Sequence, residues 1–201
     1  VDRIARRARV NKAMIYYHFP SKRALYTCII RDTFTPIAER LRTAAAEDAP
    51  PDRKLARLID ALVRSVDRST HFLPIFLREI ADGGAHLGPD ELVLIASVFA
   101  AVSGVVIEGE TQNVFQPIHP ALAHFTLVAP LVMFRATAPV RARLNALRHV
   151  EIPDADSDAL VRHLQLVAQR MLAPTRVPAL SGEREEGRGK REEGQRAGSR
   201  G

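Results

Sequence analysis

The sequence predicts an all-α protein, and three observations lead to that prediction. Apolar residues recur at spacings of three and four over several stretches, which is the period of an amphipathic helix. Alanine, leucine, valine and arginine dominate, whereas aromatic residues make up only 5% of the chain, a composition that favours helices over strands. No stretch alternates with the period of a strand, and no Asn-Gly hairpin occurs.

The first twenty residues predict two short helices separated by a turn. Residues 2–8 form a short amphipathic helix whose apolar face consists of Ile4, Ala5 and Ala8. Asn11 offers an N-cap side chain for a second helix over residues 12–19. Pro20 ends that helix because proline cannot donate to the helical ladder and disfavours helix in the residue before it. This arrangement is a helix-turn-helix, and Ser21 caps the helix that follows.

The second helix is expected to turn an unusual surface outward. Ile15 and Phe19 are four residues apart and can face inward with Ala5 and Val10. The outward side chains are then Lys12, Ala13, Tyr16, Tyr17 and His18. Lysine neutralises phosphate, tyrosine and histidine donate hydrogen bonds to phosphate oxygens, and a small alanine permits close approach to base edges. The free N–H groups of the helix that starts at Lys22 also suit a phosphate.

Charge is concentrated in the same segment. Residues 1–23 contain seven Lys or Arg and one acidic residue, a net charge of +6, which equals the formal charge of the whole chain. A basic head on a neutral body is typical of a protein that presents one end to nucleic acid. The single cysteine, Cys28, excludes an internal disulfide and fits a reducing cytoplasm.

The run from Ile4 to Leu25, which includes Ile-Tyr-Tyr-His-Phe-Pro-Ser-Lys over residues 15–22, resembles the signature of the TetR/AcrR family of bacterial repressors. The resemblance implies that four side chains hold the phosphate backbone: Asn11, Tyr16, His18 and Lys22. It implies that three others face the major groove: Lys12, Ala13 and Tyr17.

The chain departs from that family at two points. The family usually has glycine in the turn where this chain has Arg9, so we expect a turn that is strained or that gains a phosphate contact. The family's first helix precedes the helix-turn-helix and packs across it, whereas this sequence begins too late to contain it. We therefore expect either a truncated sequence or a misassigned start.

Beyond the head, the apolar pattern predicts a series of longer helices. Residues 21–47 form one helix that links head and body, with a kink expected at Pro36. Residues 52–69 carry the strongest amphipathic pattern in the chain. A shorter helix over residues 71–82 ends at a pair of glycines, and residues 90–108 form the next helix.

The remaining chain predicts two apolar helices and a tail. Residues 121–135 are apolar almost all round, which indicates burial on several sides, and residues 157–172 are amphipathic. Both would pack well against symmetry copies of themselves. Arginines over residues 141–148 indicate a solvated connection. From residue 174 a Gly, Arg and Glu composition predicts disorder.

These elements suggest three parts. Residues 1–47 form the DNA-binding head, lacking the first helix, with its linking helix; residues 48–173 form a helical effector-binding and dimerisation domain; residues 174–201 form a disordered tail. The uncharged, apolar run of residues 92–107 is shorter than the roughly 20 residues of a membrane span and has acidic flanks. We interpret it as a buried core helix and expect no membrane partner.

The sequence carries no recognisable catalytic or metal-binding motif. The chain contains no phosphate-binding glycine loop, no nucleophile elbow and no His-Glu-x-x-His sequence. His119 and His124 could approach each other but lack cysteine or acidic partners at metal-binding spacing, so surface or capping roles are favoured. We expect no enzyme activity, no cofactor and no metal.

The family resemblance further implies a dimer and a cavity for a small, often apolar effector in the body. Candidate lining residues are Phe72, Phe76, Phe99, Val102, Val106, Phe125 and Met133, although for each position taken alone a plain core role is favoured. The leading hypothesis is a cytoplasmic, ligand-responsive repressor that binds a palindromic double-stranded DNA operator as a homodimer. The alternative is a helical dimerisation or interaction protein that has lost DNA binding; a small helical enzyme is a third hypothesis that the motif search does not support. Salt-dependent binding to DNA separates the first hypothesis from the others.

Overall fold

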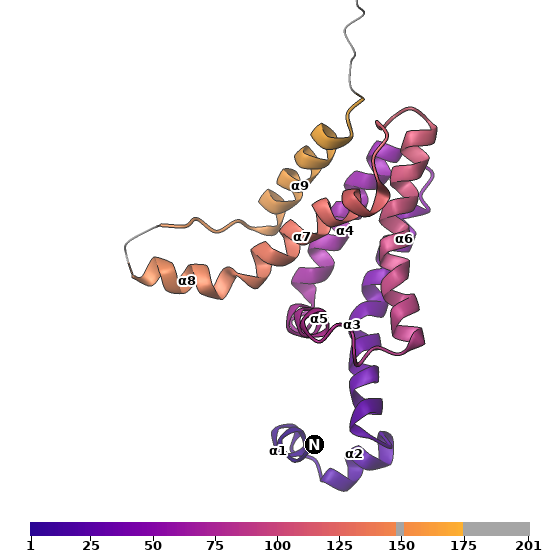
Figure 1. The fold of residues 1–201 in the computed structure, drawn as a ribbon. Coiled ribbons are helices and arrows are strands. Elements are labelled where there is room, and N and C mark those ends of the chain that lie inside the picture. The colour runs from indigo at the N-terminus through magenta and orange to yellow at the C-terminus, as the bar shows by residue number, and fades with distance from the viewer. Residues whose placement is uncertain (148–150, 175–201) are drawn as a thin grey trace, which may run out of the picture.

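A computed structural model describes residues 1–147 and 151–174, and all regular secondary structure in these residues is helical. Nine helices lie within the described residues, with no strand among them. They are α1 (Asp2–Ala8), α2 (Lys12–His18), α3 (Lys22–Ala45), α4 (Pro51–Arg68), α5 (Phe72–Ala81), α6 (Pro89–Thr111), α7 (Pro120–Ala136), α8 (Ala138–Ala146) and α9 (Ser157–Leu172). Figure 1 shows α1 and α2 at one end, joined by the long helix α3 to a bundle formed by the later helices.

Most of these helices begin where the sequence supplies a start signal. Proline occupies the first turn of α4, α6, α7 and α8, where its missing N–H costs nothing. The side chain of Asp156 accepts a hydrogen bond from the Ala159 N–H at 2.7 Å and caps α9. Gly83 and Gly84 follow α5 with φ of 63° and 72°, a left-handed conformation that glycine adopts without strain.

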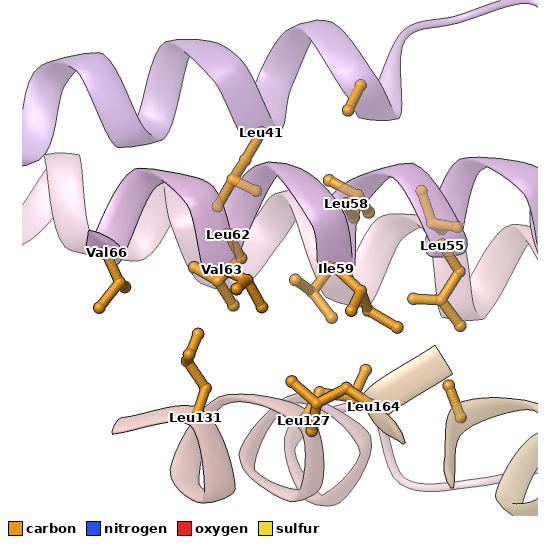
Figure 2. Packing of buried hydrophobic residues seen from close by; sticks show 14 of the residues in the cluster. Leu41, Leu55, Leu58, Ile59, Leu62, Val63, Val66, Leu127, Leu131 and Leu164 are labelled. Atoms are coloured by element: carbon orange, nitrogen blue, oxygen red, sulfur yellow. The ribbon is translucent and has the colours of Figure 1, made fainter. Parts of the chain in front are cut away.

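The core is built around α4. One face of α4 is buried along its whole length through Leu55, Leu58, Ile59, Leu62, Val63 and Val66. Figure 2 shows Leu41 of α3 on one side of α4, and Leu127 and Leu131 of α7 with Leu164 of α9 on the other. Burial of one such side chain stabilises the fold by roughly 1.5–3 kcal/mol. The strongest amphipathic pattern in the sequence therefore marks the central helix of the body.

The helices expected from the sequence are confirmed, and corrections concern three segments: α8, α7 and the helix of residues 90–108. The arginine-rich segment expected to be a solvated connection forms α8, in which Arg141 packs over the Phe134 ring and bonds Asp154 at 2.8 Å. α7 buries one face only, because Leu122, Phe125 and Met133 are exposed. The helix of residues 90–108 is likewise buried on one side. α3 continues past Pro36 as one helix. The predicted tail begins at residue 174, and its residues from 175 onward lie outside the described part of the chain.

α6 is long and apolar enough in composition to cross a membrane. Its contacts are those of a bundle helix: Val102, Val105 and Val106 lie in the core. Polar anchors hold both of its ends, since Glu91 bonds Arg31 of α3 at 2.8 Å and Glu108 bonds Lys54 of α4 at 2.9 Å. We therefore interpret α6 as part of the body.

Candidate nucleic-acid interface

The turn between α1 and α2 is tight and uses a residue other than glycine in a left-handed conformation. Arg9 ends α1 with φ 55° and ψ 38°. Its N–H bonds the Arg6 carbonyl at 3.3 Å, and the Val10 N–H bonds the Ala5 carbonyl at 3.1 Å. This pattern closes the end of a helix and normally favours glycine, because a Cβ costs about 1–2 kcal/mol in this region. Of the two alternatives expected for Arg9, backbone strain is therefore present.

The second helix starts at a defined residue. Asn11 adopts an extended backbone, and its side-chain oxygen accepts a hydrogen bond from the Ala13 N–H at 2.9 Å. Such a cap stabilises a helix by about 1 kcal/mol, which matters in a helix of two turns. α2 ends at His18, one residue earlier than expected, and Phe19 returns to an extended backbone before Pro20. The cap and the proline together fix the length of this helix.

The inner side of the head is thin. Ala5 is buried, while Ile15 and Phe19 are half-buried, as expected for inward positions. Val10 was expected to face inward with them but is 45% exposed. No residue of α2 is buried, and Met14 is 52% exposed. The head therefore presents almost all of α2 to the solvent.

The predicted outward residues are exposed along one short helix. Lys12, Ala13, Tyr16, Tyr17 and His18 are all exposed on α2, and Tyr17 reaches 83% exposure. The rings of Tyr17 and His18 meet edge to face at 5.2 Å. Lys22 is exposed in the first turn of α3, where the Ser21 hydroxyl accepts from the Ala24 N–H at 3.0 Å. The structure thus brings all seven predicted DNA-contact residues, Asn11 included, to the head.

The charge of this surface is almost uncompensated. Lys12 forms an ion pair with Asp2 at 2.9 Å, and within residues 1–23 no other Lys or Arg has an ion pair among the contacts the structure describes. The hydrogen bond between these two groups lowers the pKa of Asp2 and raises the pKa of Lys12. Both groups are exposed, so water screens the pair and Lys12 can exchange Asp2 for another anion. The arginines of the head leave a positive field around α2.

The head stands apart from the body, as Figure 1 shows. The first fully buried residue of α3 is Ile30, so the helix continues for two turns beyond the core before it reaches Lys22. A short, exposed, basic helix on a projecting arm can enter a groove about 12 Å wide without a clash from the body.

Comparisons with known proteins agree with this geometry. Residues 1–27 match the family model described as bacterial regulatory proteins, tetR family. The chain is therefore similar to TetR-family regulators in its N-terminal segment and in its fold. One similar structure is the TetR-family transcriptional regulator PfmR from Thermus thermophilus, with a TM-score of 0.62, 19% identity, and coverage of 84% of this chain and 81% of that one. Another is a tetR-family bacterial regulatory protein from Rhodococcus, with a TM-score of 0.69, 15% identity, and coverage of 86% of this chain and 85% of that one.

No curated protein matches the chain. At the identities of the two solved structures, the likeness concerns the fold, and the family model concerns the head alone. TetR-family regulators are transcription factors and not enzymes, and this agrees with the expectation that the chain has no enzyme activity. The TetR-family fold supports a DNA-binding regulator.

The seven candidate effector residues do not gather in one place. Phe72, Val102 and Val106 lie in the buried core of the body. Phe76 stacks on Phe72 at 5.3 Å, which makes these two neighbours, and Phe99 packs against His124 at 4.9 Å. Phe125 and Met133 are 60% and 55% exposed on the outer face of α7. The effector site stays a prediction, with Phe72 and Phe76 as its most closely grouped members.

Sequence reasoning missed a polar contact between α3 and the body. The Tyr26 hydroxyl donates to Glu79 at 2.5 Å, and Glu79 is 4% exposed. These residues are 53 positions apart, so no local pattern could have paired them. A glutamate within the apolar segment of residues 72–81 was the one available signal, since such a residue is seldom buried without a partner.

Proposed function

We propose that this protein is a ligand-responsive transcriptional regulator that binds a palindromic DNA operator as a homodimer and acts as a repressor. The observation that carries the proposal is the exposed, capped and basic helix α2 on an arm that projects from the body. Asn11, Tyr16, His18 and Lys22 would contact phosphates, whereas Lys12, Ala13 and Tyr17 would face base edges. A cytoplasmic location and the division into head, body and tail belong to the same proposal.

Binding to DNA across a series of salt concentrations tests the central claim. The chain is incubated with a random duplex library, and the sequences that it retains are selected and sequenced. We expect a site with two-fold symmetry and an affinity that falls steeply as salt rises. An affinity that does not depend on salt, with no selected sequence, would instead support a helical interaction protein without DNA binding.

Exposed apolar residues on α7 support the dimer. Leu122, Phe125 and Met133 fall on one stripe of the helix, and their side chains are between 55% and 63% exposed. A stripe of this kind is costly in water and is suited to a two-fold contact, in which the same surface of each copy meets its equivalent. Burial between two copies would also satisfy the expectation that this helix is covered on several sides.

The dimer is tested with a pair of variants matched in exposure. Phe125→Glu places a charge in the proposed interface, whereas Ile80→Glu places one on α5 at a residue that is also 60% exposed. We expect sedimentation to show a monomer for Phe125→Glu and a dimer for Ile80→Glu. A dimer for both variants would place the interface elsewhere.

The effector is proposed to be small and apolar, and to enter beside Phe72 and Phe76. Their rings form a cluster with Phe34 of α3, at 5.2 Å and 6.3 Å, so a ligand that separates the rings would move the helix that carries the head. The chain lacks tryptophan, so Phe76→Trp introduces a single fluorophore at this place. Apolar compounds that bind here should change its emission and weaken DNA binding at the same concentrations.

A further inference from the structure

The part of α3 nearest the head is held by few contacts. Its residues before Ile30 are exposed or half-buried, while Ile30, Phe34, Ile37 and Leu41 are fixed in the core. From Ile30 to Lys22 the helix extends by about 12 Å, at roughly 1.5 Å per residue. A tilt of about 10° at the edge of the core would therefore move Lys22 by about 2 Å, which exceeds the tolerance of a hydrogen bond to phosphate. The contacts that hold this part of α3, between Lys22 and Ile30, therefore determine the position of the head.

Among the described residues, one side-chain hydrogen bond joins this part of α3 to the body, at Tyr26, one turn from Ile30 toward the head. The Tyr26 hydroxyl donates to Glu79 of α5 at 2.5 Å, and the Glu79 side chain is 5% exposed. The His86 Nδ1 lies 3.3 Å from the same carboxylate oxygen, and the rings of Tyr26 and His86 meet edge to face at 5.7 Å. Burial and the neighbouring Glu79 raise the pKa of Tyr26 to about 12, so its hydroxyl keeps its proton and remains the donor.

The body holds α3 at a second residue from a different direction. Arg31 donates to Glu91 at 2.8 Å and to Asp90 at 2.5 Å, and both acceptors lie in the first turn of α6. Tyr26 and Arg31 are five residues apart, which places them about 140° apart around the helix. The end of α5 and the start of α6 thus hold α3 on two sides, and Figure 1 shows both helices beside α3 where it leaves the bundle.

Burying the Glu79 carboxylate costs free energy, which indicates that the contact serves to fix the orientation of α3 and not to stabilise the fold. Glu79 is 4% exposed, so its carboxylate loses its hydration, and its second oxygen is buried with no hydrogen-bond partner among the described residues. An apolar side chain at residue 79 would fill the same place without that loss, but it would permit several positions of α3. A hydrogen bond has a defined length and angle and therefore selects one.

We propose that Tyr26 and Glu79 form a clasp, closed by His86, that sets the orientation of the DNA-reading head relative to the body. They are positioning residues and do not contact DNA themselves. This inference rests on the proposed DNA binding and adds to it the residues that prepare the head for the operator. Because Glu79 lies on the helix that also carries Phe72 and Phe76, a ligand that shifts α5 would act on the head through the clasp.

Two variants remove the Tyr26–Glu79 hydrogen bond and are expected to change thermal stability in opposite directions. Tyr26→Phe removes only the hydroxyl and leaves a buried carboxylate without its donor, which should lower thermal stability. Glu79→Leu removes the buried charge together with the acceptor, which should preserve or raise stability. The matched control, Glu39→Leu, makes the same change of charge at an exposed residue on the body half of α3.

The full chain is first used to select a DNA site from a random duplex library, and the affinity of each variant for that site is then measured. We expect both clasp variants to bind about three- to tenfold more weakly than the original chain, because fewer molecules hold the head in the competent orientation. Glu79→Gln should recover most of the affinity, since its amide oxygen can accept from Tyr26. Affinities that follow thermal stability, or that stay within about twofold of the original in both clasp variants, would overturn the proposal.

A second measurement needs no DNA and keeps the clasp separable from the proposed function. Spin labels are attached at Met14→Cys on α2 and Ala100→Cys on α6, both exposed positions, in a Cys28→Ser background diluted with unlabelled chain. We expect one narrow head-to-body distance distribution, which broadens in Tyr26→Phe and Glu79→Leu. Unchanged distributions would refute the clasp. A chain that selects no DNA site but shows the broadening would refute the proposed function and retain the clasp.

Discussion

The contribution of Lys22 to DNA binding can be predicted as a change in salt dependence. Lys22 is exposed in the first turn of α3, beside the capped N-terminus. Each phosphate that a lysine neutralises adds about 0.9 to the slope of log affinity against log salt. A dimer carries two copies, so Lys22→Ala should lower the slope by about 1.8. When salt is raised from about 0.1 to 0.2 M, the fold-loss of affinity should therefore be about 3.5 times larger for the original chain than for the variant.

A control at the other end of the same helix makes the prediction specific. Arg42 is also an exposed cation on α3, and about 20 residues of helix place it about 30 Å from Lys22. That separation is nearly four Debye lengths at physiological salt, where one Debye length is about 8 Å, so Arg42→Ala should leave the slope unchanged. Fluorescence anisotropy with the selected duplex and with a random duplex at several salt concentrations gives the slopes. Equal slope changes for both variants, or none for Lys22→Ala, would refute phosphate contact by Lys22.

Three further predictions concern the head and the body. Arg9→Gly should raise the free energy of unfolding by about 1 kcal/mol, because glycine adopts the left-handed conformation at φ 55° without strain. Asn11→Ala should cost about 1 kcal/mol through loss of the α2 cap, and should weaken binding to every DNA sequence. Burial lowers the pKa of His124 in the folded protein, so the unfolded chain takes up a proton at a higher pH than the folded chain does. Stability should therefore fall as pH drops below about 6.5, and His124→Phe should remove this part of the pH dependence.

Chemical denaturation at neutral pH and at about pH 5 measures the predicted stability changes of all three variants, and fluorescence anisotropy with several duplexes measures the DNA affinity of Asn11→Ala. Arg7→Gly, which places glycine inside α1, should destabilise the protein, and the same sign for Arg9→Gly would contradict the strain argument. A loss confined to particular DNA sequences in Asn11→Ala would indicate base contact in place of capping. His163→Phe, at an exposed position of α9, serves as the control for His124→Phe, and an unchanged pH profile in both would refute the role of burial.

Local chemistry in the sequence was sufficient to predict the head. The interaction of Asn11 with Ala13, the proline after Phe19 and the Ser21 cap all act within three residues, so their consequences can be derived without a tertiary structure. The apolar spacing of α4 likewise identified a helix that packs at the centre of the body. The arginine-rich segment of α8 was missed because its helix depends on partners such as Phe134 and Asp154, which the sequence does not place beside Arg141.

The sequence by itself thus determined the helical fold class, the helix-turn-helix and the outward residues of α2, because helix periods and caps are local properties. Only the tertiary structure decided which sides of α6 and α7 are covered, that Val10 stays exposed, and that Tyr26 meets Glu79. These features depend on the angles and distances at which helices pack, and packing joins residues far apart in the chain. A periodic pattern defines a face, and the neighbour that covers the face is set by the whole fold.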